Sequence, residues 1–286
     1  MVYVGAHRSI AGGVLNTIKN TVEELKGNAI QIFNGSNRSA KLSSKTKLTP
    51  EQMKEIKKYV SDNDIYFVIH SIYLLNLCRK GTTIKFMLDN LVKDIETAND
   101  IGAEAVVLHT GYQLNLDSEE AYQNMHDNVV DVIERTNNVL ILLETPAGQG
   151  SQIATSLEDF AKLYNMFSSK HKKRLGICID TAHIFAGGVD VSSEKLFKQY
   201  LRDFNRLIGT KVIKLFHIND SQKPLNSHRD LHENIGQGYI FEKKISLSLK
   251  YLAKFASKHN IPLILETKGD RYKEEIDLLK HLALDK

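Results

Sequence analysis

The sequence predicts an α/β fold in which eight parallel strands close into a (β/α)8 TIM barrel. Three observations lead to this prediction. Short apolar runs recur along the 286 residues, amphipathic segments lie between them, and no linker-like or low-complexity stretch divides the chain. Short runs that are apolar on both faces are typical of buried parallel strands. Barrels of this kind commonly form one domain of this length, so we expect a single catalytic domain over residues 1–286.

The predicted elements alternate along the chain. The apolar runs are residues 3–6, 29–33, 66–69, 105–108, 139–143, 175–179, 211–216 and 262–265. The segments with helical periodicity are residues 49–60, 85–103, 118–136, 155–169, 193–208 and 244–259. The first helix has a clear start signal, because Thr49 can cap it, Pro50 takes the first helical position and Gln52 completes a capping box. Regular alternation favours a closed barrel over an open doubly wound sheet.

Composition narrows the class of protein. No run of eighteen apolar residues is present, which excludes a spanning helix, and the first residues do not resemble a secretory signal. Cys78 and Cys178 are too few for a disulfide framework, so we expect two packing cysteines in a reducing compartment. The cytoplasm is the expected location, with the nucleus or a virion as alternatives for a eukaryotic or viral protein. The net charge of +4 permits an anionic partner. Basic residues cluster in two stretches, one with Arg38, Lys41, Lys45 and Lys47 and the other with Arg79 and Lys80. Such clusters are expected where a protein binds the phosphate backbone of a nucleic acid. An ordinary solvent-exposed surface can have the same composition.

Side chains that can bind metal follow seven of the eight predicted strands. The residues at these strand ends are His7, His70, His109, Glu144, Asp180, His217 and Glu266. The second strand ends instead at Phe33 and Asn34. His183 follows Asp180 by three residues, and two more candidates, Asp230 and His232, follow the seventh strand. The carboxyl ends of barrel strands open on one face, so we expect these groups to meet at one mouth.

Bound cations are the simplest way to make such a cluster tolerable, because four carboxylates gathered in one mouth repel one another. A catalytic zinc site takes about three protein ligands. The expected ligands therefore suit three Zn2+ ions: His70, His109, Glu144, Asp180, His183, His217, Asp230, His232 and Glu266. A mixed imidazole and carboxylate shell suits zinc or manganese better than magnesium. His7 is left outside this set, either as a partner of a ligand or as a phosphate contact.

Eight strings of the sequence resemble, in order and spacing, the motifs of the endonuclease IV family of apurinic/apyrimidinic endonucleases. They are GAHRSIAGG, HSIYLLNL, VLHTG, LETPAGQGS, CIDTAHIFAGGVD, FHINDS, RDLHENIGQG and LILET. The match runs from His7 to about Glu275. The most specific motifs are Asp-Thr-x-His from Asp180 to His183 and Glu-x-x-Ala-Gly-Gln-Gly from Glu144 to Gly150.

The resemblance implies a trinuclear zinc site with three groups of ligands. These would be His70, His109 and Glu144; then Asp180, His217 and Glu266 with Glu144 as a bridge; and His183, Asp230 and His232. It implies a hydrolase of base excision repair that cuts double-stranded DNA 5′ to an abasic site, leaves a 3′-hydroxyl and a 5′-deoxyribose phosphate, and cleans blocked 3′ ends. Glu144, Glu266 and His183 are the expected catalytic residues.

The resemblance also implies where DNA is contacted. Arg38 and Tyr73 match positions that press into a bent duplex while the abasic sugar is flipped out, and extrusion is cheapest where the base is already missing. Asn37, Ser36 and His7 are the remaining expected DNA contacts.

The chain departs from the family pattern in three places. Ser36 stands where the family usually has asparagine, Thr145-Pro146 replaces a common Asn-Thr pair, and Leu231 stands where an arginine often separates two ligands. These departures put the contact at Ser36 and one phosphate contact in doubt. None of them alters an expected ligand.

Two other functions remain open from the sequence. A sugar isomerase or epimerase on a related barrel needs fewer ligands and leaves His183, Asp230 and His232 without a role. A protein that binds damaged DNA without cutting it would not need every ligand. We expect a monomeric enzyme with no membrane partner, and a metal count with an incision assay separates the three possibilities.

Overall fold

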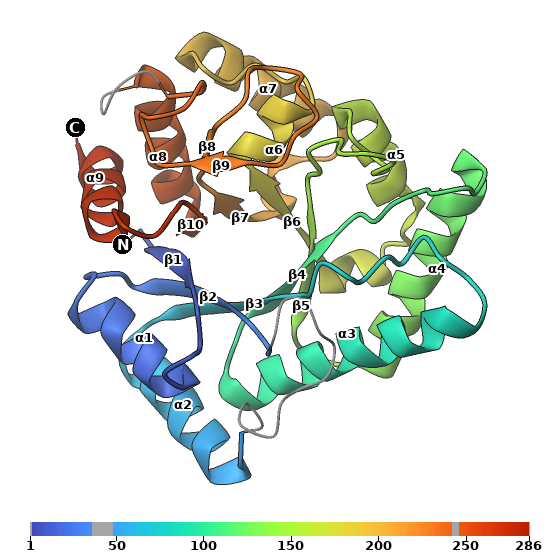
Figure 1. Cartoon of the computed structure of the whole chain (residues 1–286), viewed down its shortest axis with the longest axis horizontal. Helices are drawn as coiled ribbons and strands as arrows, with labels where there is room; N and C mark the ends of the chain where they lie inside the picture. The colour runs from blue at the N-terminus through green and yellow to red at the C-terminus, as the bar shows by residue number, and fades with distance from the viewer. Residues whose placement is uncertain (1, 36–47, 242–245, 286) are drawn as a thin grey trace.

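The chain forms the predicted closed barrel. The computed structural model describes residues 2–35, 48–241 and 246–285. The barrel strands in this part are all parallel and close in the order β1-β2-β3-β4-β5-β6-β7-β10. They are β1 (Val4–Arg8), β2 (Ala29–Phe33), β3 (Tyr66–His70), β4 (Ala105–His109), β5 (Leu140–Glu144), β6 (Leu175–Asp180), β7 (Ile213–His217) and β10 (Leu263–Leu265). Figure 1 shows them around the centre of the molecule, inside a ring of helices.

All six predicted helical segments are confirmed. The helices are α1 (Val14–Glu23), α2 (Pro50–Asp62), α3 (Thr82–Ile101), α4 (Ser118–Arg135), α5 (Leu157–Met166), α6 (Thr181–Ala186), α7 (Glu194–Leu207), α8 (Leu247–His259) and α9 (Tyr272–Leu284). The capping box at Thr49 and Gln52 is present at the start of α2. Three helices, α1, α6 and α9, lie outside the predicted segments. The seventh strand begins at Ile213 rather than at residue 211, because Thr210–Val212 form a 3-10 turn.

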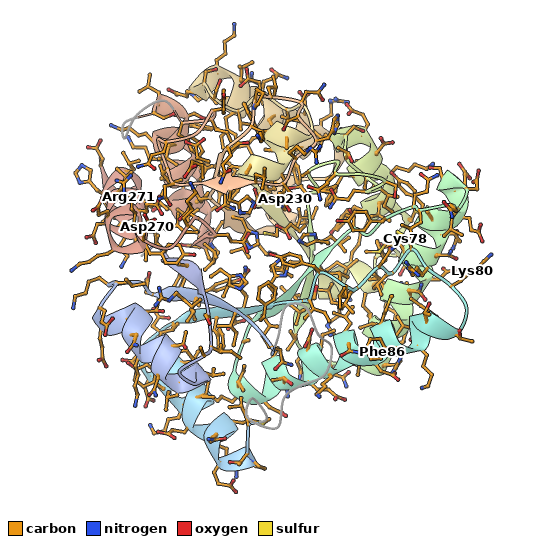
Figure 2. All side chains as sticks on the ribbon, viewed as in Figure 1. Cys78, Lys80, Phe86, Asp230, Asp270 and Arg271 are labelled. Carbon is orange, nitrogen blue, oxygen red and sulfur yellow. The ribbon has the colours of Figure 1, made fainter. Side chains whose placement is uncertain are left out.

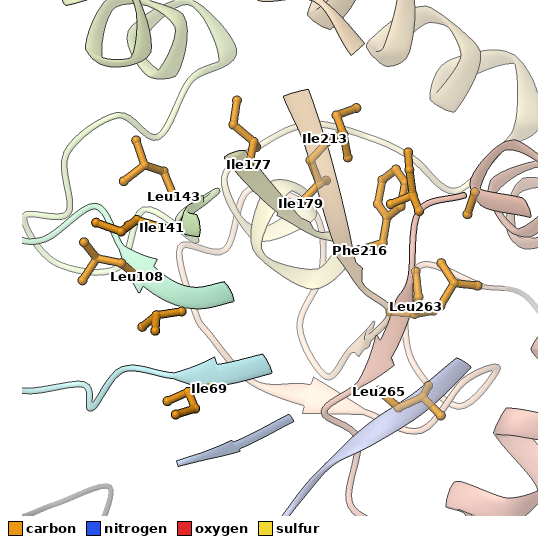
Figure 3. Packing of buried hydrophobic residues seen from close by; sticks show 14 of the residues in the cluster. Ile69, Leu108, Ile141, Leu143, Ile177, Ile179, Ile213, Phe216, Leu263 and Leu265 are labelled. Carbon is orange, nitrogen blue, oxygen red and sulfur yellow. The ribbon is translucent and has the colours of Figure 1, made fainter. Parts of the chain in front are cut away.

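Strand periodicity divides the core into two layers. Residues that point outward pack beneath the helices, and Figure 3 shows part of this layer, including Ile69, Leu108 and Ile179. Residues that point inward form a separate apolar cluster inside the barrel: Ala29, Val68, Ala105, Val107, Leu142, Cys178, Leu215 and Ile264. Both cysteines are buried and unpaired, as predicted. The barrel interior is therefore a packed floor beneath the mouth.

A long connection after β7 lies over this mouth. It contains a short antiparallel pair, β8 (Asp220–Ser221) and β9 (His232–Glu233), which Figure 1 places close to α6. Helix α9 packs against β1 and α8, and it buries Ile276, Leu279 and Leu282. In the described ranges, no helix is both long enough and apolar enough to cross a membrane.

Candidate metal centre

The two-residue repeat of the strands positions the expected ligands. Alternate side chains of a strand share a face. Val107 belongs to the apolar floor of the barrel, and His109, two residues later, therefore faces the space above that floor. The same step relates other floor residues to ligands: Val68 to His70, Leu142 to Glu144, Cys178 to Asp180, Leu215 to His217 and Ile264 to Glu266.

Glu144 lies between two groups of imidazoles. Its Oε2 is 3.2 Å from Nε2 of His70 and 2.9 Å from Nε2 of His109. Its Oε1 is 2.8 Å from Nδ1 of His217. The side chain is buried, so bulk water does not hydrate either oxygen. A carboxylate placed in this way can bridge two cations.

Asp180, His217 and Glu266 gather on the Oε1 side of Glu144. Nδ1 of His217 is 3.4 Å from Oε2 of Glu266 and 3.8 Å from Oδ2 of Asp180. One ligand atom from each of these residues and from Glu144 lies within 4.8 Å of the others, and the same is true of the group formed by His70, His109 and Glu144. Two of the three expected ligand groups thus converge.

The third expected group joins α6 to the connection after β7. Oδ1 of Asp230 lies 3.1 Å from Nε2 of His183 and 3.1 Å from Nε2 of His232. Nε2 of His232 is also 3.7 Å from Oδ2 of Asp180. The third group therefore adjoins the second at Asp180.

Asp180 also sets the position of His183. Its Oδ1 caps α6 by accepting the backbone N–H groups of Ala182 and His183, at 2.7 and 2.9 Å. Its Oδ2 accepts the side-chain amide of Asn219 at 2.7 Å. One carboxylate thus fixes the helix that carries one ligand and contributes an oxygen toward two other ligands.

The connection that carries Asp230 and His232 is held by a second buried carboxylate, Asp220. It accepts four backbone N–H groups at 2.8 to 3.1 Å, two on each oxygen, from Ser221, Gly236, Gly238 and Ile240. A Cβ at Gly238 would lie 2.4 Å from Oδ1 of Asp220, so only glycine fits there. Gln149 adds one further restraint, because its Oε1 accepts the backbone N–H of Asp230 at 3.2 Å.

Four of the expected histidine ligands have their outer ring nitrogen bonded to an amide oxygen. The pairs are His70 Nδ1 with the carbonyl of Ser71, His183 Nδ1 with that of Thr145, His232 Nδ1 with that of Glu266, and His217 Nε2 with Oε1 of Gln31. An amide oxygen only accepts, so the nitrogen that faces it carries the proton. In the neutral imidazole the other nitrogen keeps its lone pair and can bind a cation in place of a proton, which is the arrangement found in metal-binding histidines.

The charges of the cluster fit a cation. Burial alone would lower the pKa of His183, but the charges of Asp180 and Asp230 outweigh burial and raise that pKa well above its usual value. Burial opposes ionisation of Glu144, but the charges of His109 and His217 hold its pKa well below the usual range. Nε2 of His183 and of His232 are buried, and each lies 3.1 Å from Oδ1 of Asp230 without a well-oriented hydrogen bond to any described residue. Ionised carboxylates facing oriented imidazole nitrogens are the donor set that zinc prefers.

A cavity of about 360 Å³ opens above this cluster. Its lining is Tyr73, His109, His183, Gln222, Asp230, Leu231, His232 and Glu266. Tyr73 is 52% exposed and Leu231 is 42% exposed, so both present apolar surface at the entrance. Figure 2 shows Asp230 toward the middle of the barrel view, whereas Lys80 and Phe86 lie near its edge. The cavity therefore joins the expected ligands to solvent.

The expected DNA contacts lie in different places. Ser36, Asn37 and Arg38 are outside the described residues, as are three lysines of the same basic stretch. Tyr73 is at the cavity entrance. The side chain of His7 is only 14% exposed; its ring lies 4.4 Å from that of Phe33 and its Nδ1 is 3.2 Å from Oε1 of Glu266. This position favours His7 as a partner of the expected ligand Glu266, one of the two alternatives that the sequence left open, over a phosphate contact.

Comparison with known proteins identifies the relatives of this chain. Residues 20–282 match the protein family described as "Xylose isomerase-like TIM barrel". The "Probable endonuclease 4" of Malacoplasma penetrans (strain HF-2) is 34% identical over 284 residues, which cover 95% of this chain and 91% of the relative. The chain belongs to the endonuclease IV family. The resemblance of its motifs to that family is thereby confirmed.

Two further members of the family extend the comparison. The "Apurinic-apyrimidinic endonuclease 1" of Plasmodium berghei (strain Anka) is 33% identical over 291 residues, which cover 97% of this chain and 55% of the relative. The crystal structure of endonuclease IV from Thermus thermophilus superposes with a TM-score of 0.81 at 25% identity and covers 98% of both chains. The barrel and its family are therefore supported by sequence and by structure.

Several residues of the centre were not among the expected site residues. Gln31, on the one strand without an expected ligand, points into the centre. Asp220 and Gln149 hold the connection after β7. Thr145, one of the departures from the family pattern, accepts the backbone N–H of Asp180 with its Oγ1 at 3.1 Å and bonds His183 through its carbonyl. Only the position of Gln31 could have been read from the sequence, as the polar residue two places after inward-facing Ala29.

Proposed function

We propose that this member of the endonuclease IV family is a zinc-dependent endonuclease that cuts double-stranded DNA 5′ to abasic sites. Family membership makes it a DNA-cleaving hydrolase, and the proposal adds the metal, the lesion and the position of the cut. The observation that carries the proposal is the convergence of three ligand groups, joined through Glu144 and Asp180, beneath one open cavity.

The residues that would hold zinc are the three groups described above. Zinc bound there would neutralise charge on a phosphodiester and lower the pKa of water toward neutrality. Both oxygens of Glu144 face imidazole nitrogens, so this carboxylate serves better as a bridging ligand than as a free base. His183 and Glu266 act in catalysis as ligands on either side of Asp180.

The cavity entrance would receive the lesion. Tyr73 offers an exposed aromatic face to a base pair or sugar, and Leu231 offers an exposed aliphatic one. An abasic sugar can leave the helix at low cost because it has no stacked base. Arg38, Asn37 and Ser36, in the basic stretch that follows β2 in the sequence, would contact the same duplex. We propose removal of blocking groups from 3′ ends as a second use of the same site.

The third ligand group distinguishes the proposal from a sugar isomerase. An isomerase needs no counterpart of His183, Asp230 and His232 arranged around a further cation, whereas Asp230 lies 3.1 Å from both histidines here. Metal analysis of the purified protein should find about three zinc ions per chain. A count of one or two zinc ions would favour the isomerase.

An incision assay tests the activity itself. A labelled duplex with one abasic site should be cut once, on the 5′ side, and the same duplex with an intact base should not be cut. Removal of zinc by a chelator should abolish incision, and added Zn2+ should restore it. His183→Ala should be inactive but folded. Full activity of this variant at controlled zinc, or of the zinc-stripped enzyme, would contradict the proposal.

The proposal includes a monomer that acts in the cytoplasm. Gel filtration alone and with abasic duplex checks the first part, and a dimer on DNA would overturn it. Fractionation of cells that express a tagged chain checks the second.

A further inference from the structure

Gln31 is a polar residue deep in the wall of the metal centre. It lies on β2, two residues after Ala29 of the apolar floor, and it is fully buried. Its amide reaches three residues that are far away in the sequence. Oε1 is 2.8 Å from Nε2 of His217, and Nε2 is 2.6 Å from Oε1 of Glu266 and 2.8 Å from Nδ1 of His7.

These contacts allow only one orientation of the amide. The NH2 group lies 2.6 Å from the Glu266 carboxylate, which only accepts, and 2.8 Å from Nδ1 of His7, which accepts when the His7 proton is on Nε2. A flipped amide would set its carbonyl oxygen 2.6 Å from the carboxylate oxygen, with no hydrogen between them. The amide oxygen is therefore the atom that faces Nε2 of His217.

The orientation of the amide decides which nitrogen of His217 carries a proton. An amide oxygen accepts only, so Nε2 of His217 must donate to it. Nδ1 is then the nitrogen that a cation would bind in place of a proton, and it faces Glu144 at 2.8 Å and Glu266 at 3.4 Å. The other anchored histidines use backbone carbonyls, which no substitution removes. His217 depends on a side chain.

We infer that Gln31 is a positioning residue that makes His217 an Nδ1 ligand and holds Glu266 beside it. This inference rests on the proposed zinc site and deepens it, because it assigns to β2 a role in the centre. Hydrogen-bond partners of metal ligands typically change metal affinity by about 10- to 100-fold when they are removed. Loss of the Gln31 amide should lower the affinity for one zinc ion by such a factor and leave zinc bound at the group of His70 and His109.

Two substitutions distinguish the effect of the amide's hydrogen bonds from the effect of the volume that the side chain fills. Gln31→Met keeps the length of the side chain and removes both the acceptor and the donor. Gln31→Glu keeps an acceptor for Nε2 of His217 but sets a carboxylate against Glu266. Gln123→Met is the matched control, because Gln123 is an exposed residue of α4 whose side-chain amide donates to Asp127 one turn later on the same helix.

The first measurement determines which ring nitrogen of His217 carries the proton in the zinc-loaded protein. In a long-range 1H–15N spectrum of histidine-labelled protein, assigned with His217→Asn, we expect a protonated Nε2 and a metal-bound Nδ1. Gln31→Glu should keep the protonated Nε2, and Gln31→Met should lose its hydrogen-bonded signal. A wild-type His217 that binds zinc through Nε2 would overturn the inference without any variant.

The second measurement is zinc affinity by chelator competition. Gln31→Met should release one zinc about 10- to 100-fold more readily than the wild type, with kcat/KM reduced to a similar extent, and Gln123→Met should match the wild type. Equal affinity in Gln31→Met and wild type would refute the inference while the proposed function stands. A wild type that binds no zinc would instead refute the proposed function. If Gln31→Met does not fold, the spectra of the wild type and of Gln31→Glu still test whether Nε2 of His217 is protonated.

Discussion

Asparagine in place of Asp220 tests how the third ligand group is held. The carboxylate of Asp220 accepts four backbone N–H groups, and three of the donors belong to residues 236–240 of the connection that carries Asp230 and His232. Asparagine has nearly the same shape but only one carbonyl oxygen. Two of the four donors would therefore face an NH2 group instead of an acceptor.

The expected cost follows from these contacts. A buried donor that loses its acceptor costs about 1–3 kcal/mol, so two donors cost about 2–6 kcal/mol. The whole fold of a typical domain is stable by about 5–15 kcal/mol. Asp220→Asn should therefore remain folded, and the connection should open locally because the unsatisfied donors lie within it. We expect the variant to lose the zinc ion held by His183, Asp230 and His232 and to lose incision activity.

The assay combines urea unfolding, zinc content and amide hydrogen exchange of residues 236–240. Asp62→Asn is the control, because Asp62 is 55% exposed at the end of α2 and pairs with Lys58. Such a surface change should alter stability by no more than about 0.5 kcal/mol. An Asp220→Asn protein with wild-type stability, exchange and zinc content would refute the reasoning.

Three further predictions follow from single positions. Burial raises the pKa of Asp94 to about 7. The folded chain therefore keeps a proton that the unfolded chain releases near pH 4. Because the folded state binds more protons in this range, Asp94 lowers the free energy of unfolding as the pH rises from about 4 to about 7. Asp94→Asn should flatten that dependence in urea unfolding at pH 5 and pH 8, and an unchanged slope would contradict it. A Cβ at Gly5 would lie 1.6 Å from the carbonyl oxygen of Ala29, so Gly5→Ala should prevent the pairing of β1 with β2 and cost more than about 4 kcal/mol, whereas Gly12→Ala meets no atom within 4 Å and should be tolerated. Leu231→Arg should add one phosphate contact, seen in anisotropy titrations as a slope of log K against log salt that is steeper by about 0.9; an equal slope would show that residue 231 does not reach the backbone.

Much of the barrel could be predicted because its signals are local. The run at 29–33 is β2 to the residue, and Thr49, Pro50 and Gln52 mark the start of α2. Helices α1, α6 and α9 were missed. Neither α1 nor α9 begins with a side-chain cap, and α1 has no acidic residue in its first turn, so both lack the local start signals on which such a prediction depends. Helix α6 has a cap, Asp180, but its 6 residues are too few to show a helical period.

The candidate ligands could be found because barrel topology sends every strand end to one mouth. The departures at Thr145 and Leu231 were also visible in the sequence, but their consequences were not. The carbonyl that orients His183 belongs to Thr145, and a backbone carbonyl is the same for any residue. The exposure of Leu231 at the cavity entrance depends on the path of the connection after β7, which Asp220 and Gln149 hold by contacts across long stretches of chain.

By itself the sequence determined the strands, most of the helices and the chemical identity of the expected ligands, because periodicity and motif spacing act over a few residues. Tertiary structure alone decided which expected ligands lie together, which oxygen of Glu144 faces which imidazole, and which nitrogen of His217 faces the carboxylates. These depend on barrel closure. Gln31 meets His217 and Glu266 across separations of 186 and 235 residues, and only the folded chain brings such groups within hydrogen-bonding distance.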